Sequence, residues 1–434
     1  MERLMHYVWQ HRLVLQADMV TTDGERVEIV DPGQLNHDAG PDFFNAKVRI
    51  GERMWCGNVE MHLRASDWHR HGHDHDPAYS SVILHVVGAE DCRITVANGR
   101  TLPQMVMRCA PDFHNRYVNM VDSPTDRLAC YNELKEAPRI YVTDCITAMA
   151  FERLYEKSDR ITALVKRLDG NWTEAFYVTL ARALGFGLNG QAFEQLALGV
   201  PLRTLLKHRD DPGAVEGLLF GLAGLLPDAA EKEGDEDTYV QIMRREYTFL
   251  RHKFNLTPPD GVVWRMSRTR PHNFPHRRIA ALAAMVTEGF TIASRACSVS
   301  TLDEARGLFD ITLPYYWVRR YHFGAPSGSA PSRAFSKQSI DILVINAIVP
   351  LLHAYGTFFG DERLQSLAVS FLEQIPAEQN TITRLFEGAG VHCADAFTSQ
   401  AVIHLRRNYC ETRKCLYCRL GHQFLCHKAK YTPA

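Results

Sequence analysis

The pattern of hydrophobic and polar residues divides the chain into a strand-rich first part and a helical remainder. Residues 2–13 carry apolar side chains at helical spacing, which predicts an amphipathic helix. Apolar or alternating runs then predict strands at residues 27–30, 42–50, 54–62, 82–87, 92–96 and 102–107. A short helical segment is expected around residues 77–81, between the third and fourth of these strands. This order of elements predicts an α/β module.

From residue 141 onward the apolar positions recur every three to four residues, as in amphipathic helices. The expected helices lie at residues 141–168, 171–184, 190–198, 214–225, 238–253, 275–297, 302–308, 335–353, 361–373, 378–387 and 394–409. We therefore predict an α+β protein with three parts: an α/β module at residues 1–135, a large all-α region at residues 136–408 and a cysteine-rich tail at residues 409–434.

The composition is that of an ordinary globular protein, with 46% hydrophobic and 23% charged residues among 434. No apolar run approaches the roughly 20 residues of a membrane span, so no membrane association is expected. The first residues lack the basic-then-apolar pattern of a signal peptide. Eleven cysteines, four of them near the end of the chain, favour metal binding in a reducing compartment, and we expect a cytoplasmic protein.

The net charge of −1 gives no overall signature of nucleic-acid binding, but basic residues are concentrated at residues 251–278 and after His404. Arginine side chains suit phosphate binding. They equally suit docking of the helical region onto acidic groups of the first module, and this second role is slightly favoured for residues 251–278. The candidates for contact with DNA or RNA are Arg268, Arg270, Arg277, Arg406 and Arg407.

Three residues of the strand-rich part form the candidate catalytic group: Asp42, Glu60 and His62. Glu60 and His62 lie two apart in one predicted strand, so their side chains project from the same face, and Asp42 opens a neighbouring strand. Two carboxylates suit Mg2+ or Mn2+, which would acidify a bound water and polarise phosphate oxygens. His62 either accepts a proton from that water or binds the metal, which would shift the preference toward Mn2+ or Zn2+.

Pro41-Asp42 and Glu60-Met61-His62, set in the order helix, three strands, helix, strand, resemble the core of the PD-(D/E)XK superfamily, which has the restriction-endonuclease-like fold. The resemblance implies a metal-dependent nuclease or phosphodiesterase that acts on DNA or RNA. His62 stands where most members carry lysine, and Glu2 matches the acidic residue that many relatives place beside the metal.

The chain as a whole also resembles an uncharacterised bacterial family, domain of unknown function 2851. The stretches that carry this resemblance are Asp38–Phe43, Gly57–His62, Arg270–Pro275 and Cys415–Cys418. The resemblance implies no known activity.

A histidine-rich run follows the candidate strand, with His69, His71, His73 and His75 set among aspartates. It approaches the metallo-β-lactamase signature but is one residue short of it. A zinc site of imidazoles and carboxylate and a solvated polar loop are both compatible with this run. His85 interrupts an apolar strand, which indicates a core histidine or a residue in the wall of the site.

The tail holds Cys410, Cys415, Cys418 and Cys426 within 17 residues. Four thiolates at this spacing predict a tetrahedral Zn2+ site or a [4Fe–4S] cluster with a stabilising role. Some nucleases of the superfamily that the first module resembles also carry a cysteine-bound cluster.

Three hypotheses about function follow. The first is a Mg2+- or Mn2+-dependent nuclease that uses Asp42, Glu60 and His62, with Glu2 beside them. The second is a non-catalytic scaffold that binds nucleic acid or protein and contains a structural metal site. The third is a zinc hydrolase centred on His62 and the run from His69 to His75.

Overall fold

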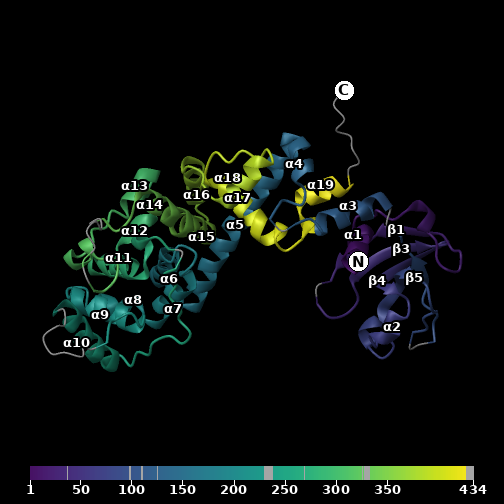
Figure 1. The fold of residues 1–434 in the computed structure, drawn as a ribbon. Helices are drawn as coiled ribbons and strands as arrows, with labels where there is room; N and C mark the ends of the chain where they lie inside the picture. The colour runs from purple at the N-terminus through teal and green to yellow at the C-terminus, as the bar shows by residue number, and fades with distance from the viewer. Residues whose placement is uncertain are drawn as a thin grey trace. The chain divides into compact units, whose positions relative to one another are not determined.

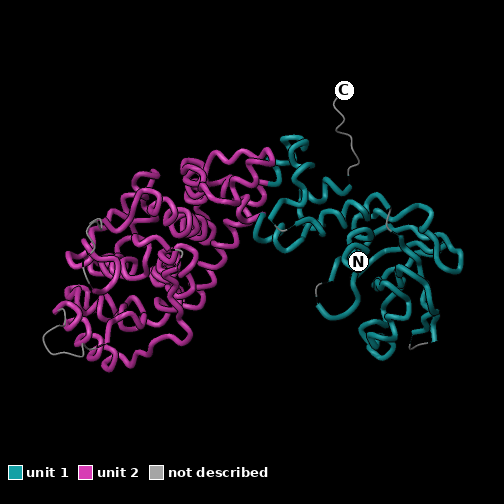
Figure 2. The backbone as a smooth tube through the Cα atoms, in the orientation of Figure 1, with its two compact units in different colours: residues 1–145, 406–434 teal, residues 146–405 magenta. Residues whose placement is uncertain are grey.

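The computed structural model describes residues 1–36, 38–96, 99–108, 111–124, 126–228, 238–267, 269–324, 326 and 333–426. These residues form a mixed α+β protein, with a mixed sheet near the N-terminus and a mostly helical remainder. The backbone groups into two compact units (Figure 2): unit 1 comprises Met1–Cys145 and Arg406–Ala434, and unit 2 comprises Ile146–Leu405. The predicted boundaries at residues 135 and 408 stay predictions.

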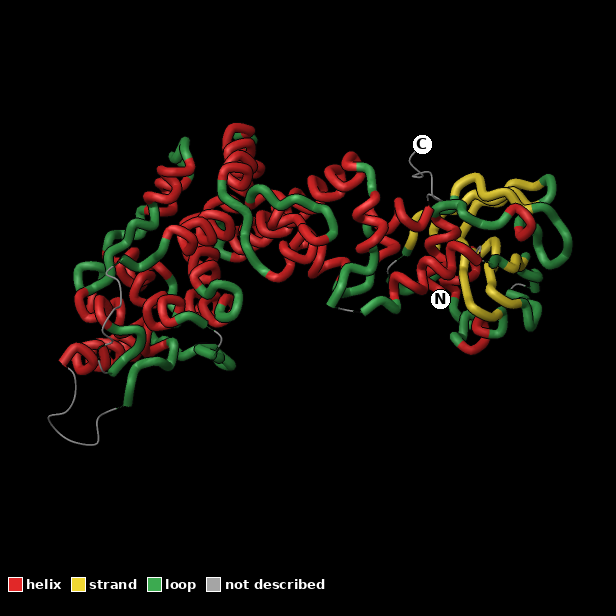
Figure 3. The backbone as a smooth tube through the Cα atoms, turned by 45° about the horizontal axis from the view of Figure 1, so that its top comes forward, coloured by secondary structure: helices red, strands yellow, loops and turns green. Residues whose placement is uncertain are grey.

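Unit 1 contains the sheet (Figures 1 and 3), whose strands run in the order β1-β3-β4-β5-β6, with β2 paired to β3. The strands are β1 (Val27–Asp31), β2 (Gln34–Leu35), β3 (Phe43–Ile50), β4 (Arg53–Arg64), β5 (Val82–Ala89) and β6 (Gln104–Val106). The pairs β1–β3 and β3–β4 are antiparallel, whereas β4–β5 and β5–β6 are parallel.

Most of the predicted strands are confirmed, and one is wrong. Residues 92–96 contribute only an isolated bridge between Thr95 and Thr101. This segment packs beneath Trp68 by means of Ile94 and Val96, so its apolar residues are buried without a strand being formed. Burial alone therefore produced the alternation that predicted a strand here.

Residues 59–62 of β4 and the first six residues of β5 are buried on both faces of the sheet. On one face Val59 and Met61 pack in the same core as Leu4 and Val8 of α1 (Glu2–Gln10). On the other face the alternation of the strand brings Glu60 and the residue two positions on, His62, to the surface of the sheet. The same strand thus supplies a hydrophobic contact on one side and polar chemistry on the other.

The C-terminal segment completes unit 1. It consists of a π-turn at Arg406–Cys410, a 3-10 turn at Cys415–Tyr417 and α19 (Arg419–Cys426). Leu416 and Leu425 belong to the same core as the sheet and α1. The hydroxyl of Tyr7 on α1 hydrogen-bonds His422 Nδ1 at 2.5 Å. Segments from the two ends of the chain therefore share one core.

In the sequence the sheet is followed by α3 (Pro111–Val121), α4 (Tyr131–Glu136) and α5 (Arg139–Arg167), and α5 begins in unit 1 and continues in unit 2. The other helices of unit 2 are α6 (Trp172–Leu184), α7 (Gly190–Gly199), α8 (Leu202–Leu206), α9 (Pro212–Leu222), α10 (Thr238–Lys253), α11 (Pro275–Thr287), α12 (Ile292–Ala296), α13 (Leu302–Gly307), α14 (Lys337–Leu343), α15 (Val349–Phe359), α16 (Glu362–Gln374), α17 (Thr381–Gly388) and α18 (Ala396–Leu405).

Several of these helices begin where the sequence provides a capping side chain. Asn171, Asp211 and Asp361 each accept a hydrogen bond from a backbone N–H of the first turn. The predicted helix at residues 275–297 is in fact two helices. Gly289 and Phe290 both adopt positive φ, 86° and 49°, which ends α11 and turns the chain into α12.

Helix α9 belongs to the core of unit 2, and all its residues from Ala214 to Leu222 are buried. It packs closely against α10 because Gly217 and Gly221 have no side chain. A Cβ at Gly217 would lie 2.6 Å from Met243 O, and one at Gly221 would overlap the Tyr247 ring. The one acidic residue of α9, Glu216, is described below because its carboxyl group is enclosed with the apolar side chains.

Among the described residues, the continuous helix at Lys337–Phe359 is long and apolar enough to cross a membrane. In this structure, 67% of its apolar window is buried inside the protein. Such burial is typical of a core helix in a soluble protein, which passes the same test of length and composition.

Candidate metal centre

The first carboxylate of the site is placed by a loop that ends at the start of β3. The side-chain amide of Asn36 donates to Pro41 O at 3.1 Å, and the Asn36 backbone N–H donates to Asp42 O at 2.7 Å. Asp42 is further fixed to β4, because the Met61 N–H donates to Asp42 Oδ2 at 2.9 Å. In return, the Asp42 N–H donates to Glu60 Oε2 at 3.1 Å. The two carboxylates predicted from sequence are thus brought together.

His62 lies on β4 beside Glu60, with its Nε2 3.5 Å from Glu60 Oε1. Its other nitrogen, Nδ1, is 2.9 Å from Nε2 of His85 on β5. When His62 donates from Nδ1 to His85, its Nε2 keeps a lone pair that faces Glu60. A hydrogen bond of this kind fixes the tautomer and the ring orientation of a metal-binding histidine. His85 is therefore part of the wall of the site.

Two histidines of the run join this pair. After α2 (Asp67–Arg70) the chain turns at Gly72, whose φ is 77°, and the backbone N–H of His73 donates to Trp68 O at 3.2 Å. His71 Nδ1 lies 3.1 Å from His62 Nε2. His73 Nε2 lies 3.4 Å from Glu60 Oε1, and this buried nitrogen makes no hydrogen bond.

The spacing of these atoms fits one metal ion. Nitrogens of His62, His71 and His73 all lie within 4.8 Å of one another, and this is the only such group of three possible ligands among the described residues. A tetrahedral ion with bonds of about 2.0–2.1 Å separates its ligand atoms by roughly 3.4 Å. The 3.1 Å between His62 Nε2 and His71 Nδ1 is close to that value, and Glu60 Oε1 lies beside the group, 3.5 Å from His62 Nε2 and 3.4 Å from His73 Nε2.

Burial shapes the protonation of the site. It raises the pKa of Glu60 to about 9, and the negative charge of Asp42 and the weaker influence of Glu2 act in the same direction. Burial also lowers the pKa of His62 and of His85 to about 3, with the neighbouring imidazoles adding to the effect. Neutral imidazole is the form that binds a metal ion. A buried carboxyl group, a second one that is partly exposed, and neutral imidazoles are an environment that a cation would stabilise.

The site is open on one side. His71 is exposed, and the side chains of His73 and Asp42 are 11% and 24% exposed. On the other side the ring of Tyr79 stacks on His73 with centroids 3.7 Å apart, beneath the buried Trp68. Access from solvent together with a packed floor suits a site that exchanges ligands with solution.

A family model described as a protein of unknown function (DUF2851) matches residues 2–381. The chain belongs to the DUF2851 family. Searches of curated proteins and of solved structures gave no significant match. The matched range contains every residue of the metal centre, whereas the cysteines after residue 409 lie beyond it.

In this DUF2851 protein the structure brings together Asp42, Glu60 and His62, as predicted from their spacing, and Glu2 is close enough for its charge to act on Glu60. It adds His6 of α1, whose Nε2 lies 3.3 Å from Asp42 Oδ2. The helical period of residues 2–13 gave no sign of this role, since it reports which face of the helix is apolar and not what the polar face meets.

The rest of the histidine run points elsewhere. His69 pairs with Asp74 at 2.7 Å on the surface, and His75 is exposed. The run therefore divides between site residues and surface residues. A turn at Gly72 decides which histidines face the carboxylates, and sequence spacing alone could not show that.

Two of the arginines predicted to contact nucleic acid are buried, and for them that prediction is wrong. Arg277 is 1% exposed and donates to Arg320 O at 3.3 Å, among other backbone carbonyls. Arg406 is 8% exposed and donates to Arg127 O at 3.0 Å. Buried guanidinium groups cannot reach a phosphate. Arg270 and Arg407 are exposed and stay candidates, and Arg268 lies outside the described residues.

The cysteines that the structure groups together differ from those predicted for the tail site. Cys410, Cys415 and Cys418 are joined by thiols from earlier in the chain, as argued below. Cys426 instead lies 3.2 Å from Tyr7 Oη and 3.7 Å from His422 Nδ1. Its assignment as the fourth metal ligand stays a prediction without support from these contacts.

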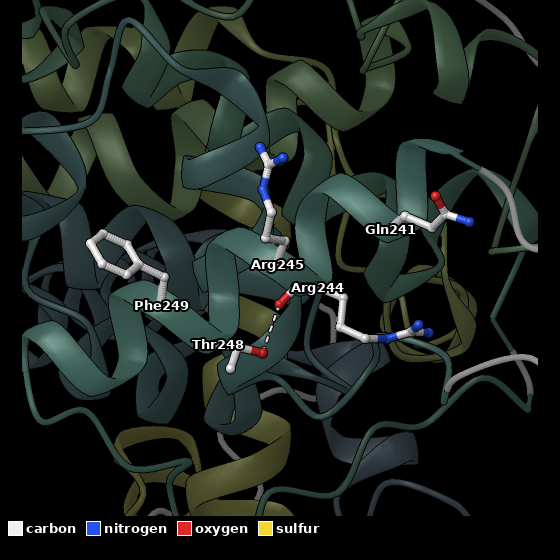
Figure 4. A pocket seen from close by; sticks show the side chains of 5 residues that line it. All are labelled: Gln241, Arg244, Arg245, Thr248 and Phe249. Carbon is white, nitrogen blue, oxygen red and sulfur yellow. Dashed lines mark hydrogen bonds between the residues drawn. The ribbon is translucent and has the colours of Figure 1, made fainter.

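A separate hollow on α10 in unit 2 is lined by Gln241, Arg244, Arg245, Thr248 and Phe249 (Figure 4). Thr248 donates to the backbone carbonyl of Arg244 at 2.8 Å, and Arg244 donates to Pro227 O at 2.7 Å. The residues that line this hollow include no carboxylate, imidazole or thiol. It therefore offers no group for metal binding or acid–base chemistry.

Proposed function

We propose that this DUF2851 protein is a metal-dependent hydrolase that cleaves phosphodiester bonds in nucleic acid. The observation that carries the proposal is the convergence of Glu60, His62, His71 and His73, with Asp42 beside them, at a site open to solvent. The described cysteines form no disulfide bond, which supports the proposal of a reducing, cytoplasmic setting.

The topology supports the resemblance to the restriction-endonuclease-like fold. Three antiparallel strands, β1, β3 and β4, are followed by β5, which runs parallel to β4. Asp42 immediately precedes β3, and Glu60-Met61-His62 lies within β4. Helix α1 adds Glu2 and His6 to the same neighbourhood. The substrate class in the proposal rests on this arrangement.

The ligand set favours Mn2+ or Zn2+ over Mg2+. Three imidazoles with one carboxylate suit borderline transition metals, whereas Mg2+ prefers oxygen ligands. When bound, such an ion lowers the pKa of a water molecule and offsets the charge that develops on the phosphate. His62, His71 and His73 would hold the ion, with the Glu60 carboxyl group beside it, and the fourth position would stay open for water.

Other residues of the chain orient a metal-binding histidine or accept a proton. His85 holds the tautomer of His62 through the 2.9 Å contact between Nε2 and Nδ1. Asp42 and His6 form a carboxylate–imidazole pair, 3.3 Å apart, at the accessible edge of the site. This pair is placed to accept a proton from an attacking water molecule. Exposed Arg270 and Arg407 stay candidates for contact with the nucleic acid.

Two readouts test the proposal: metal content and cleavage. Purified protein is stripped with a chelator and reloaded with Mn2+, Zn2+ or Mg2+. Metal content is then measured by mass spectrometry, and cleavage is followed on labelled DNA and RNA oligonucleotides. We expect one ion at this site and cleavage with Mn2+ or Zn2+. His73→Ala and Glu60→Gln are expected to lower both metal affinity and cleavage by about a hundredfold or more.

His75→Ala is the matched control, because His75 belongs to the same run but is exposed. It should retain metal and activity. Equal cleavage by His73→Ala and His75→Ala would remove the assignment of this site. Tight metal binding without cleavage of any substrate would favour the non-catalytic scaffold, since structural metal sites are closed and catalytic ones keep an open position.

A further inference from the structure

Five thiols come together in unit 1, away from the histidine site. Cys130 precedes α4 and Cys145 lies on α5, whereas the other three belong to the C-terminal segment. The three C-terminal members are Cys410, Cys415 and Cys418. Figure 1 shows the C-terminal segment beside α3 and α4.

Side-chain contacts next to the cysteines fix this arrangement. Arg406, four residues before Cys410, donates to the carbonyl of Arg127, three residues before Cys130, at 3.0 Å. Arg419 pairs with Asp144 at 3.1 Å, which places the neighbouring residues Cys418 and Cys145 together.

Arg413, which lies between Arg406 and Arg419 in the sequence, makes a further set of contacts. Arg413 donates to Ser123 Oγ at 2.9 Å and to Met120 O at 3.4 Å. Cys130 and Cys415 both pack against the core that contains Leu416. The C-terminal segment is therefore held along the segment that carries Cys130 and Cys145.

The thiols also interact directly. Cys145 and Cys418 share a hydrogen bond. Cys410, Cys415 and Cys418 all lie close enough to Cys130 to interact with it electrostatically. Cysteine thiols gathered in this way are typical ligands of a metal centre.

The distances between the thiols distinguish an iron–sulfur cluster from a single zinc ion. A tetrahedral zinc ion with bonds of about 2.3 Å would bring its sulfur ligands to within roughly 3.8 Å of one another. No three of the described thiols lie within 4.8 Å of one another, although three imidazoles elsewhere do. Sulfur ligands of an iron–sulfur cluster bind different iron atoms, so they stand farther apart than ligands of one ion.

We propose that Cys130, Cys410, Cys415 and Cys418 ligate an iron–sulfur cluster that fastens the C-terminal segment to the start of α4. Cys145 is not one of these ligands; it lies next to the cluster and hydrogen-bonds Cys418. Cys426 is not a ligand, because its sulfur is occupied with Tyr7 and His422. This site is independent of the proposed hydrolase activity.

The test uses the full-length protein, produced with added iron and purified without oxygen. We expect a brown protein with a broad absorbance band in the visible region and about four iron and four acid-labile sulfide per chain, as for a [4Fe–4S] cluster. Cys130→Ser should lower iron and sulfide about tenfold, since a ligand is lost. Cys426→Ser is the matched control and should keep both. Sulfide distinguishes this site from the histidine site, which would bind an ion alone.

The wild-type protein decides the matter even where Cys130→Ser fails to fold. Absence of sulfide from wild-type protein after anaerobic reconstitution would overturn the proposal, as would one zinc ion bound by these cysteines in place of iron. Loss of the cluster in Cys426→Ser with retention in Cys130→Ser would overturn the choice of ligands. Circular dichroism of each variant shows whether the fold is kept.

Discussion

Replacing Glu216 by glutamine is expected to change how the stability of the helical unit depends on pH. Glu216 on α9 is 1% exposed. Trp317 Nε1 donates to its Oε1 at 3.1 Å, and the Tyr239 hydroxyl donates to its Oε2. Burial raises the pKa of Glu216 from 4.5 to about 7, although these two hydrogen bonds lower it in part.

The sign follows from the direction of this pKa. The folded protein holds the proton more tightly than the unfolded chain, so the contribution to stability is fully present below pH 4.5. It falls as the pH rises toward 7 and is lost above that value. The difference between about 7 and 4.5, at about 1.4 kcal/mol for each pH unit, amounts to roughly 3 kcal/mol.

The assay is urea unfolding followed by circular dichroism at pH 5 and at pH 8. Glu216→Gln stands in for the protonated carboxyl group, so at pH 5 it should be within about 1 kcal/mol of wild type. At pH 8 it should be more stable than wild type by as much as about 3 kcal/mol. The exposed Glu373 supplies a control, Glu373→Gln, which should follow wild type at both values. The reasoning is refuted when Glu216→Gln and wild type lose the same stability between pH 5 and pH 8.

Three further substitutions have expected outcomes. Gly421→Ala would drive a Cβ into the carbonyl oxygen of Cys415, so the C-terminal segment should be cut faster in limited proteolysis, and unchanged cutting would argue against this packing. Arg277→Met should lower the free energy of unfolding by at least about 2 kcal/mol in urea, because backbone carbonyls such as Arg320 O lose a charged donor. The same variant should bind nucleic acid as wild type does, whereas a selective loss of binding would restore Arg277 as a contact residue. Thr301→Ala removes the capping box of α13 and should cost about 1 kcal/mol in the same titration, and no change would show that the cap is dispensable.

The sheet and two of its candidate site residues, Glu60 and His62, could be predicted from the sequence. Alternation along β3 and β4 gave the strands, and the period of two placed Glu60 and His62 on one face. Helix positions were also predicted well, because α6 and α16 carry both the apolar period and the capping residue. The point where α11 ends was missed, since it depends on the positive φ of Phe290.

Other residues of the site could not be predicted, because contacts distant in sequence leave no local period. His73 is directed by a turn, and His6 meets Asp42 only after α1 has packed on the sheet. Cys130 stands alone in its own neighbourhood, and only the folded chain brings it to Cys410. Arg277 looked like part of a basic surface, yet it is buried in α11 together with Arg278 and the apolar run Ile279–Val286.

The sharing of one core by Tyr7, Leu416 and Leu425 has a consequence for biosynthesis. During translation the residues of the sheet are synthesised early. The apolar face of α1 and of the surrounding helices is covered only after the residues near 416 have been synthesised. A chain that ends before residue 416 would leave this apolar face uncovered and would therefore be less stable.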